Sequence, residues 1–215
     1  MDEVDITERL QAGLATLGDP VSAEQVQRLS VYLQLLAKWN RAFNLTAVRN
    51  PNDMVVRHIL DSLVVRVFLR GRTVLDVGTG AGLPGIPLAV MEPDRAFTLL
   101  DSGGKKIRFL RHVLAELQLG NVEVVHSRVE AYTPEQGYDT VMCRAFSSLG
   151  DFVSACGRLI TEDGRLLAMK GRYPDQELTE LAPPWSARCQ PVRVPGLDGQ
   201  RHAVLIDHAK SVARP

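Results

Sequence analysis

Apolar residues recur at helical spacing through the first 70 residues. One helix is predicted near residues 5–17 and a second near 22–39, where Ser22 and Gln25 resemble a capping box. A third begins after Asn50, a suitable N-cap, with Pro51 at its first position. Its predicted apolar face consists of Met54, Val55, Ile59, Leu63 and Val67. Residues 1–70 are therefore expected to form a small N-terminal helical cap.

From residue 71 onward, predicted strands alternate with helices. Strands are expected at Thr73–Val77, Phe97–Asp101, Val122–Val125, Asp139–Cys143 and Arg165–Met169, with helices from Pro84, from Gly104 to Leu119, and near 148–160. A helix near 174–181 and strands around Val192 and at Ala203–Asp207 complete the chain, the last two antiparallel at one edge. Such alternation predicts an α/β, Rossmann-like domain over 71–215 with a mostly parallel, seven-stranded sheet.

A glycine-rich loop, Gly78-Thr79-Gly80-Ala81-Gly82-Leu83, joins the first predicted strand to its helix. Glycines let main-chain atoms approach a ligand closely. The spacing departs from the dinucleotide pattern G-x-G-x-x-G, because the third glycine comes one place early and Leu83 fills its position. Asp76, just before the loop, would attract the cationic amino group of S-adenosylmethionine but repel a pyrophosphate. We therefore expect S-adenosylmethionine to bind at this loop, at Asp76, Gly78, Gly80 and Gly82, as in class I methyltransferases.

Other chemically useful residues follow the next strands of the predicted sheet. Asp101 lies 23 positions after Gly78 and could bind ribose hydroxyls or cap the next helix. Val129 and Glu130 follow the third strand, where Glu130 could accept the adenine amino group or be solvated. Arg144 follows the fourth. Because the carboxyl ends of parallel strands share one edge, these residues are expected to meet at one site.

Arg144 stands where methyltransferases of this architecture usually face the methyl acceptor. Enzymes that methylate exocyclic amino groups of bases typically have Asn or Asp, two prolines and an aromatic residue there, whereas this chain has Cys143-Arg144-Ala145-Phe146. Guanine N7 already presents a lone pair and needs no general base. Arg144 is therefore predicted to be catalytic by holding the acceptor, the alternative being a structural ion pair. Cys143 is interpreted as a small buried hydrophobe rather than a nucleophile.

Charge is balanced overall but unevenly distributed. The 215 residues have a formal net charge of zero, whereas residues 38–72 contain seven Lys or Arg against two Asp. A local basic face could bind RNA phosphates. The candidate RNA-contacting residues are the Trp39–Arg49 segment, His58, Lys105, Lys106, Arg128, Lys170 and Arg201. Trp39 and Phe43, four residues apart, could equally be packing residues of the helical cap.

The remaining composition excludes several classes. The three cysteines are odd in number and widely spaced, which argues against disulfides and against a bound metal. Charged residues and prolines interrupt the longest apolar runs, and the acidic start has no signal-like apolar region. We expect a cytoplasmic protein without membrane association, and nothing demands more than a monomer.

Several longer segments resemble the bacterial family of small-subunit rRNA guanine-N7 methyltransferase G, also called glucose-inhibited division protein B. They are Lys38–Arg49, Arg57–Leu63, Asp76–Leu88, Leu99–Ser102, Ser127–Glu130, Arg144–Phe146 and Ala168–Gly171. The resemblance implies cofactor contacts at Gly78, Leu83, Val129, Glu130 and Arg144. It also implies methylation of one guanine N7, guanine 527, in 16S rRNA, free or within the small ribosomal subunit. Relatives often have Ser at 143 and Arg at 106.

Two other functions remain open at this stage. A ribosome-assembly RNA-binding factor with a vestigial S-adenosylmethionine site would explain the basic helical segment and the lack of an obvious catalytic base. A small-molecule methyltransferase is a weaker alternative, because its pocket would not need the basic residues.

Overall fold

The computed structural model describes residues 3–18, 20–144 and 146–208, so Ala145 of the Arg144–Phe146 segment lies outside it. The helical elements are α1 (Glu3–Thr16), α2 (Ala23–Phe43), α3 (Pro51–Met54), the π-helix η1 (Val55–Leu60), α4 (Asp61–Leu63), the 3-10 helix η2 (Arg66–Phe68), α5 (Gly85–Met91), α6 (Gly104–Leu117), the short 3-10 helices η3 (Val129–Ala131) and η4 (Gly157–Leu159), α7 (Leu149–Cys156) and α8 (Asp175–Thr179). The strands are β1 (Thr73–Val77), β2 (Ala96–Asp101), β3 (Val122–His126), β4 (Tyr138–Cys143), β5 (Ile160–Lys170), β6 (Trp185–Pro191) and β7 (His202–His208).

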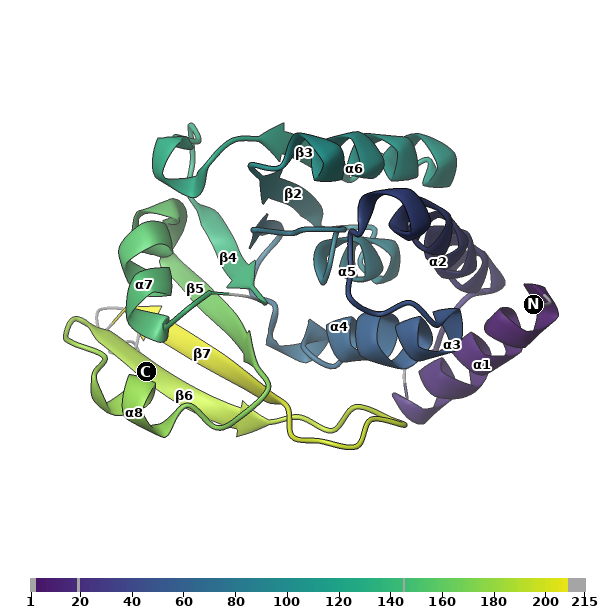
Figure 1. Ribbon diagram of the computed structural model, residues 1–215. Coiled ribbons are helices and arrows are strands. Elements are labelled where there is room, and N and C mark those ends of the chain that lie inside the picture. Colours follow the sequence, from purple (N-terminus) through teal and green to yellow (C-terminus); the bar gives the residue numbers. More distant parts are fainter. Residues whose placement is uncertain (1–2, 19, 145, 209–215) are drawn as a thin grey trace.

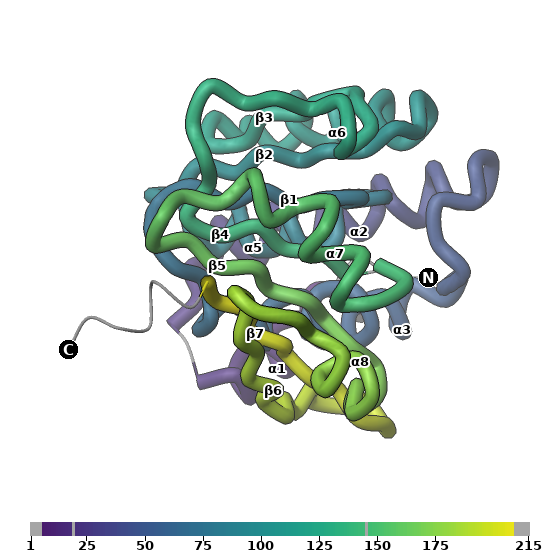
Figure 2. Tube along the Cα trace, turned by 90° about the vertical axis from the view of Figure 1, so that its left-hand side faces the viewer, coloured from purple at the N-terminus to yellow at the C-terminus, as the bar shows by residue number. Residues whose placement is uncertain are grey.

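The seven strands form one sheet in the order β3-β2-β1-β4-β5-β7-β6. Figure 2 shows them stacked from β3 at the top to β6 at the bottom. Strands β1 to β5 pair in parallel, and β7 is antiparallel to both β5 and β6. This confirms the predicted mostly parallel sheet with an antiparallel edge. Strand order reverses between β1 and β4, and ligands of open α/β sheets bind at such a switch point.

Side chains of alternate strand residues pack into two separate hydrophobic cores, one on each face of the sheet. In Figure 1, α7 lies to the left of the sheet, while α2, α5 and α6 lie to its right. On the right-hand side, Val74 and Met142 pack in one cluster with α5, α6 and the N-terminal helices. On the other side, Leu75 and Val141 pack with Phe152 of α7. A period of two along buried strands produces this division.

The helical cap shares its core with the sheet and holds the glycine loop directly. Helix α2 begins at the predicted capping box of Ser22 and Gln25 and ends at Asn44 in the left-handed conformation. Tyr32 of α2 is fully buried, and its hydroxyl donates to the Ala81 carbonyl at 2.9 Å. Burial raises the pKa of this phenol well above its ordinary value, so it remains a donor. The helical cap therefore holds the glycine loop through the hydrogen bond from Tyr32 to the Ala81 carbonyl.

We expect a Tyr32→Phe variant to be less stable by about 1–3 kcal/mol, because the buried Ala81 carbonyl loses its hydroxyl donor. Thermal unfolding followed by circular dichroism measures this. Tyr173→Phe is the matched control, since Tyr173 is exposed. Equal melting temperatures for Tyr32→Phe and the wild type would show that the hydrogen bond contributes nothing.

The third predicted helix is interrupted by a π-helical turn. Asn50 caps α3 as expected, accepting from the Asn52 amide at 2.9 Å, and Pro51 is its first residue. The turn η1 then changes the rotation of the following residues, and η2 tightens the chain into a 3-10 helix. Val67, predicted to lie on the apolar face, is 77% exposed. That prediction is wrong because it assumed an uninterrupted period of 3.6 residues.

Boundaries near the carboxyl end also differ from the prediction. Strand β5 begins at Ile160 rather than Arg165. The polar residues Thr161–Gly164 belong to the strand, because Ile160 already pairs with Tyr138 of β4, and the register shifts between Tyr138 and Thr140. The helix expected near 148–160 is therefore shorter and ends in η4. Strand β6 ends at Pro191, one residue before Val192, whose amide still donates to the Arg201 carbonyl at 2.8 Å.

Candidate active site

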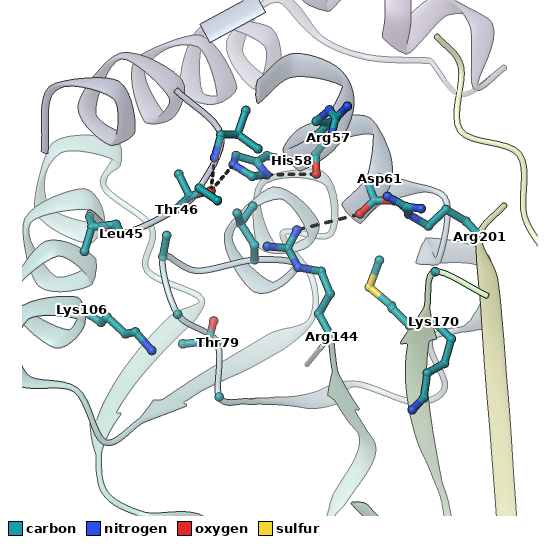
Figure 3. Close-up of a pocket in the computed structure, with 18 residues that line it drawn as sticks. Leu45, Thr46, Arg57, His58, Asp61, Thr79, Lys106, Arg144, Lys170 and Arg201 are labelled. Atoms are coloured by element: carbon teal, nitrogen blue, oxygen red, sulfur yellow. Dashed lines mark hydrogen bonds and ion pairs between the residues drawn. The ribbon is translucent and has the colours of Figure 1, made fainter. Parts of the chain in front are cut away.

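A cavity of about 570 Å³ lies at the switch point between β1 and β4 (Figure 3). It lies between the glycine loop on one side and the N-terminal cap and the ends of β4, β5 and β7 on the other. Its lining residues are Leu45, Thr46, Ala47, Val48, Arg57, His58, Asp61, Gly78, Thr79, Gly80, Ala81, Leu83, Lys106, Arg144, Met169, Lys170, Gly171 and Arg201. Five of these are Lys or Arg and one is Asp, so the cavity attracts anions.

The glycine loop presents main chain rather than side chains to this cavity. Gly78 has φ +67°, and a Cβ built there would meet no atom within 4 Å. A Cβ at Gly80 would come no nearer than 3.9 Å to the Gly78 carbonyl. Gly82 is buried, and its Cβ would lie 2.5 Å from Ile86. Gly78 and Gly80 therefore leave room for a ligand against the backbone, which fits S-adenosylmethionine, while Gly82 allows the loop to pack on α5.

Asp76 lies behind the loop rather than in the cavity. Its side chain is fully buried, and Oδ2 accepts from the Thr79 hydroxyl at 2.7 Å and from the Gly85 amide at 2.9 Å. Burial raises the pKa of this carboxyl to about 6, although both hydrogen bonds and Arg144 favour the ionised form. The carboxylate thus ties the two ends of the loop together. Only Oδ2 makes these hydrogen bonds, whereas Oδ1 is buried without a hydrogen-bond partner, so the direct cofactor contact expected from the charge stays a prediction.

Asp101 also organises the loop. Its Oδ2 accepts from the Gly80 amide at 2.9 Å, Oδ1 accepts from the Gly103 amide at 2.8 Å, and Lys106 Nζ lies 3.2 Å from Oδ2. Of the two alternatives for Asp101, side-chain capping of the next helix is not seen, because the N-cap of α6 is Gly103 without a side-chain cap hydrogen bond, and ribose binding stays a prediction. Lys106 lines the cavity and its side chain is 43% exposed, so a ligand could displace it from Asp101.

Val129 and Glu130 do not line this cavity. They lie in η3, just after β3, at the same edge of the sheet as Asp101. Nη2 of Arg158 donates to the Val129 carbonyl at 2.6 Å, and Glu130 is exposed. The structure thus places the expected adenine-binding residues beyond Asp101 and outside the cavity that Arg144 faces.

Arg144 enters the cavity from the end of β4 and pairs with Asp61 of the helical cap. Nη1 of Arg144 lies 3.9 Å from Asp61 Oδ2, and Arg201 Nε donates to Asp61 Oδ1 at 2.8 Å. Figure 3 shows both guanidinium groups beside this carboxylate. The sequence left acceptor binding and a structural ion pair as alternatives for Arg144, and its side chain is placed where it can do both.

His58 is buried in the wall of the cavity as a neutral imidazole. Nδ1 lies 3.0 Å from the Arg57 carbonyl and must donate to it, so Nε2 accepts from the Thr46 hydroxyl at 2.9 Å. Burial, followed by the charge of Arg144, lowers the pKa of His58 to about 4. His58 was predicted to contact RNA, and in the structure both of its nitrogens are already bonded within the protein.

His58 gives folding a pH dependence of definite sign. Because the folded pKa of about 4 lies below the ordinary value of 6.5, the unfolded chain binds more protons between these values. The His58 contribution to stability is therefore full above pH 6.5 and is lost as pH falls toward 4. We expect His58→Gln, which can still accept from Thr46, to lose less stability than the wild type over this range.

Urea unfolding at several pH values measures this difference. Asp76 acts in the opposite direction, since its raised pKa favours the folded protein below pH 6, but it is common to both proteins. His126→Gln, at an exposed position of β3, controls for the loss of a histidine. Parallel stability curves for the wild type and His58→Gln would contradict the expected contribution.

The other candidate RNA-binding residues divide into two groups. Lys170 and Arg201 line the cavity, and Lys170 Nζ lies 2.8 Å from Glu177 Oε2. Lys105 and Arg128 are exposed and lie outside it. Trp39 packs against Phe109 and Phe43, with ring centroids 5.5 and 5.2 Å away, so it is a packing residue. Of the Trp39–Arg49 segment, Leu45 to Val48 reach the cavity.

The sequence did not assign individual roles to Asp61, Thr79 and Met169, which line the cavity. Asp61 had one signal, as an acid within a strongly basic stretch that resembles a known family. Its contact with Arg201 spans 140 positions of sequence and could not be inferred from local spacing. Thr79 hydrogen-bonds Asp76 across the loop, which only the loop conformation brings about.

Cys143 is the last residue of β4. Cys143 is buried, and burial raises the pKa of its thiol well above the ordinary value, as expected for a packing residue. Within residues 3–18, 20–144 and 146–208, no group of three His, Cys, Asp or Glu side chains could hold a metal ion. In the same part of the chain, no helix has the length and apolar character needed to span a bilayer.

Solved structures that superpose on this chain include two methyltransferases. A SAM-dependent methyltransferase from Aquifex aeolicus superposes with a TM-score of 0.54 at 21% identity, over 71% of this chain and 92% of that one. Ribosomal protein L11 methylase from Lactobacillus delbrueckii subsp. bulgaricus gives 0.53 at 18% identity, over 69% and 76%. With its glycine loop at the switch point, the chain has the fold of class I methyltransferases.

Sequence comparison then identifies the family. The family model described as rRNA small subunit methyltransferase G matches residues 25–204. Ribosomal RNA small subunit methyltransferase G from Photobacterium profundum is 52% identical over 192 residues, which cover 88% of this chain and 93% of that protein. The Salmonella agona protein of the same name is 51% identical over 203 residues, covering 94% and 98%. The chain belongs to the rRNA small subunit methyltransferase G family.

Proposed function

We propose that the protein transfers the methyl group of S-adenosylmethionine to N7 of a guanine in 16S rRNA, the position that the family resemblance implies being guanine 527. Guanine N7 is favoured as the methyl acceptor because the two cavity side chains that could accept a proton, His58 and Asp61, already have partners. His58 has both nitrogens hydrogen-bonded, and Asp61 is paired with Arg201 and Arg144.

A cavity without an available base suits a ring nitrogen better than an exocyclic amine. Guanine N7 presents a lone pair in the plane of the base and can attack a methyl group without first losing a proton. An exocyclic amino group must give up a proton during methylation, and among the lining residues described above no unpaired carboxylate or imidazole can take it. The enzyme then contributes positioning and electrostatic fit.

Different residues of this chain would bind the cofactor, the guanine and the RNA phosphates. When bound, S-adenosylmethionine supplies an electrophilic methyl group on a sulfonium. Gly78, Gly80 and Leu83 would hold it along the loop, with Asp101 at the ribose and Val129 and Glu130 at the adenine. Arg144 would hold the guanine at O6 or an adjoining phosphate, since its planar guanidinium suits both. Lys106, Lys170 and Arg57 at the cavity would neutralise RNA phosphates, with Lys105 and Arg128 on the exposed surface.

The test is to map the methylated nucleosides of 16S rRNA from cells with and without the protein. We expect 7-methylguanosine at one position to disappear on deletion and to return when the purified enzyme and S-adenosylmethionine are added to that rRNA or to small subunits. Reduction, aniline cleavage and primer extension locate the position. Persistence of the mark in the deletion strain would refute the proposal.

The alternative of an assembly factor with a vestigial cofactor site has less support. A vestigial site has no reason to keep Gly78 and Gly80 open toward the cavity, and here both are open. Isothermal titration with S-adenosylmethionine separates the two functions. Saturable binding with methyl transfer supports the enzyme, whereas rRNA binding without cofactor binding supports the assembly factor.

We further propose that the enzyme acts as a cytoplasmic monomer on 16S rRNA or the small subunit. One chain supplies every residue that lines the described cavity, from the cap to β7, so a second copy is not needed to complete it. Light scattering during size-exclusion chromatography in the presence of substrate RNA tests the monomer. A dimer as the active species would contradict it.

A further inference from the structure

The carboxylate of Asp61 joins three segments that are far apart in the sequence. Asp61 is the first residue of α4 and is 4% exposed. Arg201, just before β7, donates to Oδ1, and Arg144, just after β4, faces Oδ2. Figure 3 shows Asp61 between the two arginines at the wall of the cavity. One buried negative charge therefore faces two positive ones, and the three side chains together carry a net charge of +1.

The two arginines are held to different degrees. Arg201 Nε lies 2.8 Å from Asp61, and its Nη1 also donates to the Gln200 carbonyl at 2.8 Å. Two hydrogen bonds fix this side chain. Arg144 approaches Asp61 only to 3.9 Å, beyond hydrogen-bond length, and its side chain is 31% exposed. Arg144 is thus oriented by charge while its donors remain available to another acceptor.

The backbone at Asp61 is shaped to bring the carboxylate to this place. The π-helix η1 ends immediately before Asp61, whose amide donates to carbonyls of that turn, including His58. Arg57, His58 and Asp61 all line the cavity from this widened turn. π-Helical turns are rare and occur often at functional sites. The turn is therefore a second observation that points to a role for Asp61.

We propose that Asp61 is a positioning residue of the methyltransferase, which directs the Arg144 guanidinium toward the methyl acceptor while Arg201 serves as its fixed counter-charge. This inference rests on the proposed function. Without the carboxylate, two neighbouring cations repel each other at a partly buried site, and each turns toward solvent. Arg144 then loses the orientation from which it holds the acceptor, although the cofactor loop is unchanged.

The test is the Asp61→Asn variant, which keeps the shape and removes the charge. We expect kcat for methyl transfer to rRNA to fall on the order of 10- to 100-fold, because misplaced contacts cost this much. The dissociation constant for S-adenosylmethionine, measured by titration without RNA, is expected to stay within about twofold, since the loop contacts are intact. An unchanged kcat would overturn the proposal, as would equal losses in kcat and cofactor affinity.

Arg201→Gln supplies a second arm. This variant removes Arg201 as a partner and leaves only Arg144 of the two arginines beside Asp61. We expect the Arg144 guanidinium to move toward the carboxylate, away from the methyl acceptor, and kcat to fall. The double variant Asp61→Asn/Arg201→Gln has neither the repulsion between Arg144 and Arg201 nor the stronger attraction of Arg144 to Asp61. The fold-loss in kcat should therefore be smaller than the product of the two single fold-losses. A purely structural role predicts losses that multiply, and that result would contradict the proposal.

Asp207→Asn is the matched control. Asp207 is also buried and accepts from Arg165 at 2.9 and 3.1 Å, but it lies near the end of β7 opposite the middle of β5, whereas the cavity residue Arg201 precedes the start of β7. We expect it to lower the melting temperature and leave kcat unchanged. If the wild type transfers no methyl group to rRNA, the proposed function fails. If the wild type is active and Asp61→Asn equals it, only the role of Asp61 fails.

Discussion

Arg144→Ala is expected to reduce kcat/KM for methyl transfer to rRNA on the order of 100- to 1000-fold, because it removes the cavity group best placed to hold the acceptor. The side chain enters the cavity from the end of β4. Its Nη1 lies 3.9 Å from Asp61 Oδ2, so the carboxylate can orient the guanidinium without forming a hydrogen bond to it. Its loss also leaves Asp61 with a single cationic partner. Single-turnover transfer of radiolabelled methyl groups to deletion-strain rRNA measures the effect.

Two comparisons make this result specific. Arg144→Lys keeps the charge but not the planar fork, so it should recover only part of the activity. Arg188→Ala removes an arginine of β6 whose side chain is 66% exposed, and it should behave like the wild type. Near-normal turnover of Arg144→Ala on ribosomal substrate would refute the catalytic role.

Gly78→Asp is expected to weaken S-adenosylmethionine binding on the order of 100-fold, which corresponds to about 2.7 kcal/mol. Its Cβ would project into open space at the cavity, since no protein atom lies within 4 Å. The new side chain would occupy the space against the main chain that we propose for the cofactor. A smaller loss of stability, about 1–2 kcal/mol, follows from the left-handed backbone at φ +67°.

Gly18→Asp separates these two effects. Gly18 also has a left-handed backbone, with φ +80°, and open space around its Cβ, but it does not line the cavity. It should show a comparable loss of stability with normal cofactor binding. If both variants bind S-adenosylmethionine alike in isothermal titration, the glycine loop is not the cofactor site.

The local elements of this fold could be predicted from the sequence because their signals are short-range. The capping box at Ser22, Pro51 at a helix start and the strand–loop–helix around Gly78 each depend on neighbours within a few residues. The parallel direction of β1 to β5 followed from the alternation of strands and helices, because parallel neighbours are joined by crossover connections. The exposed Val67 shows the limit, since an uninterrupted helical period could not foresee a π-helical turn.

Side-chain roles were harder to infer than element types. Asp76 was assigned to the cofactor by charge, yet its carboxylate is buried beneath the loop that it stabilises. His58 was assigned to RNA by its basic surroundings, yet burial keeps it neutral. In both cases sequence gave the charge and the neighbourhood, but burial and hydrogen-bond partners decided what the group does.

The sequence by itself determined the class of fold, the glycine loop and the family, because these reside in contiguous segments whose backbone preferences and spacing are local. Only the tertiary structure decided which of its many cations face one cavity and which are solvated. It alone brought Asp61, Arg144 and Arg201 together from the cap, β4 and β7. The reason is physical, since the strength of a charge pair depends on distance and burial, which chain separation does not encode.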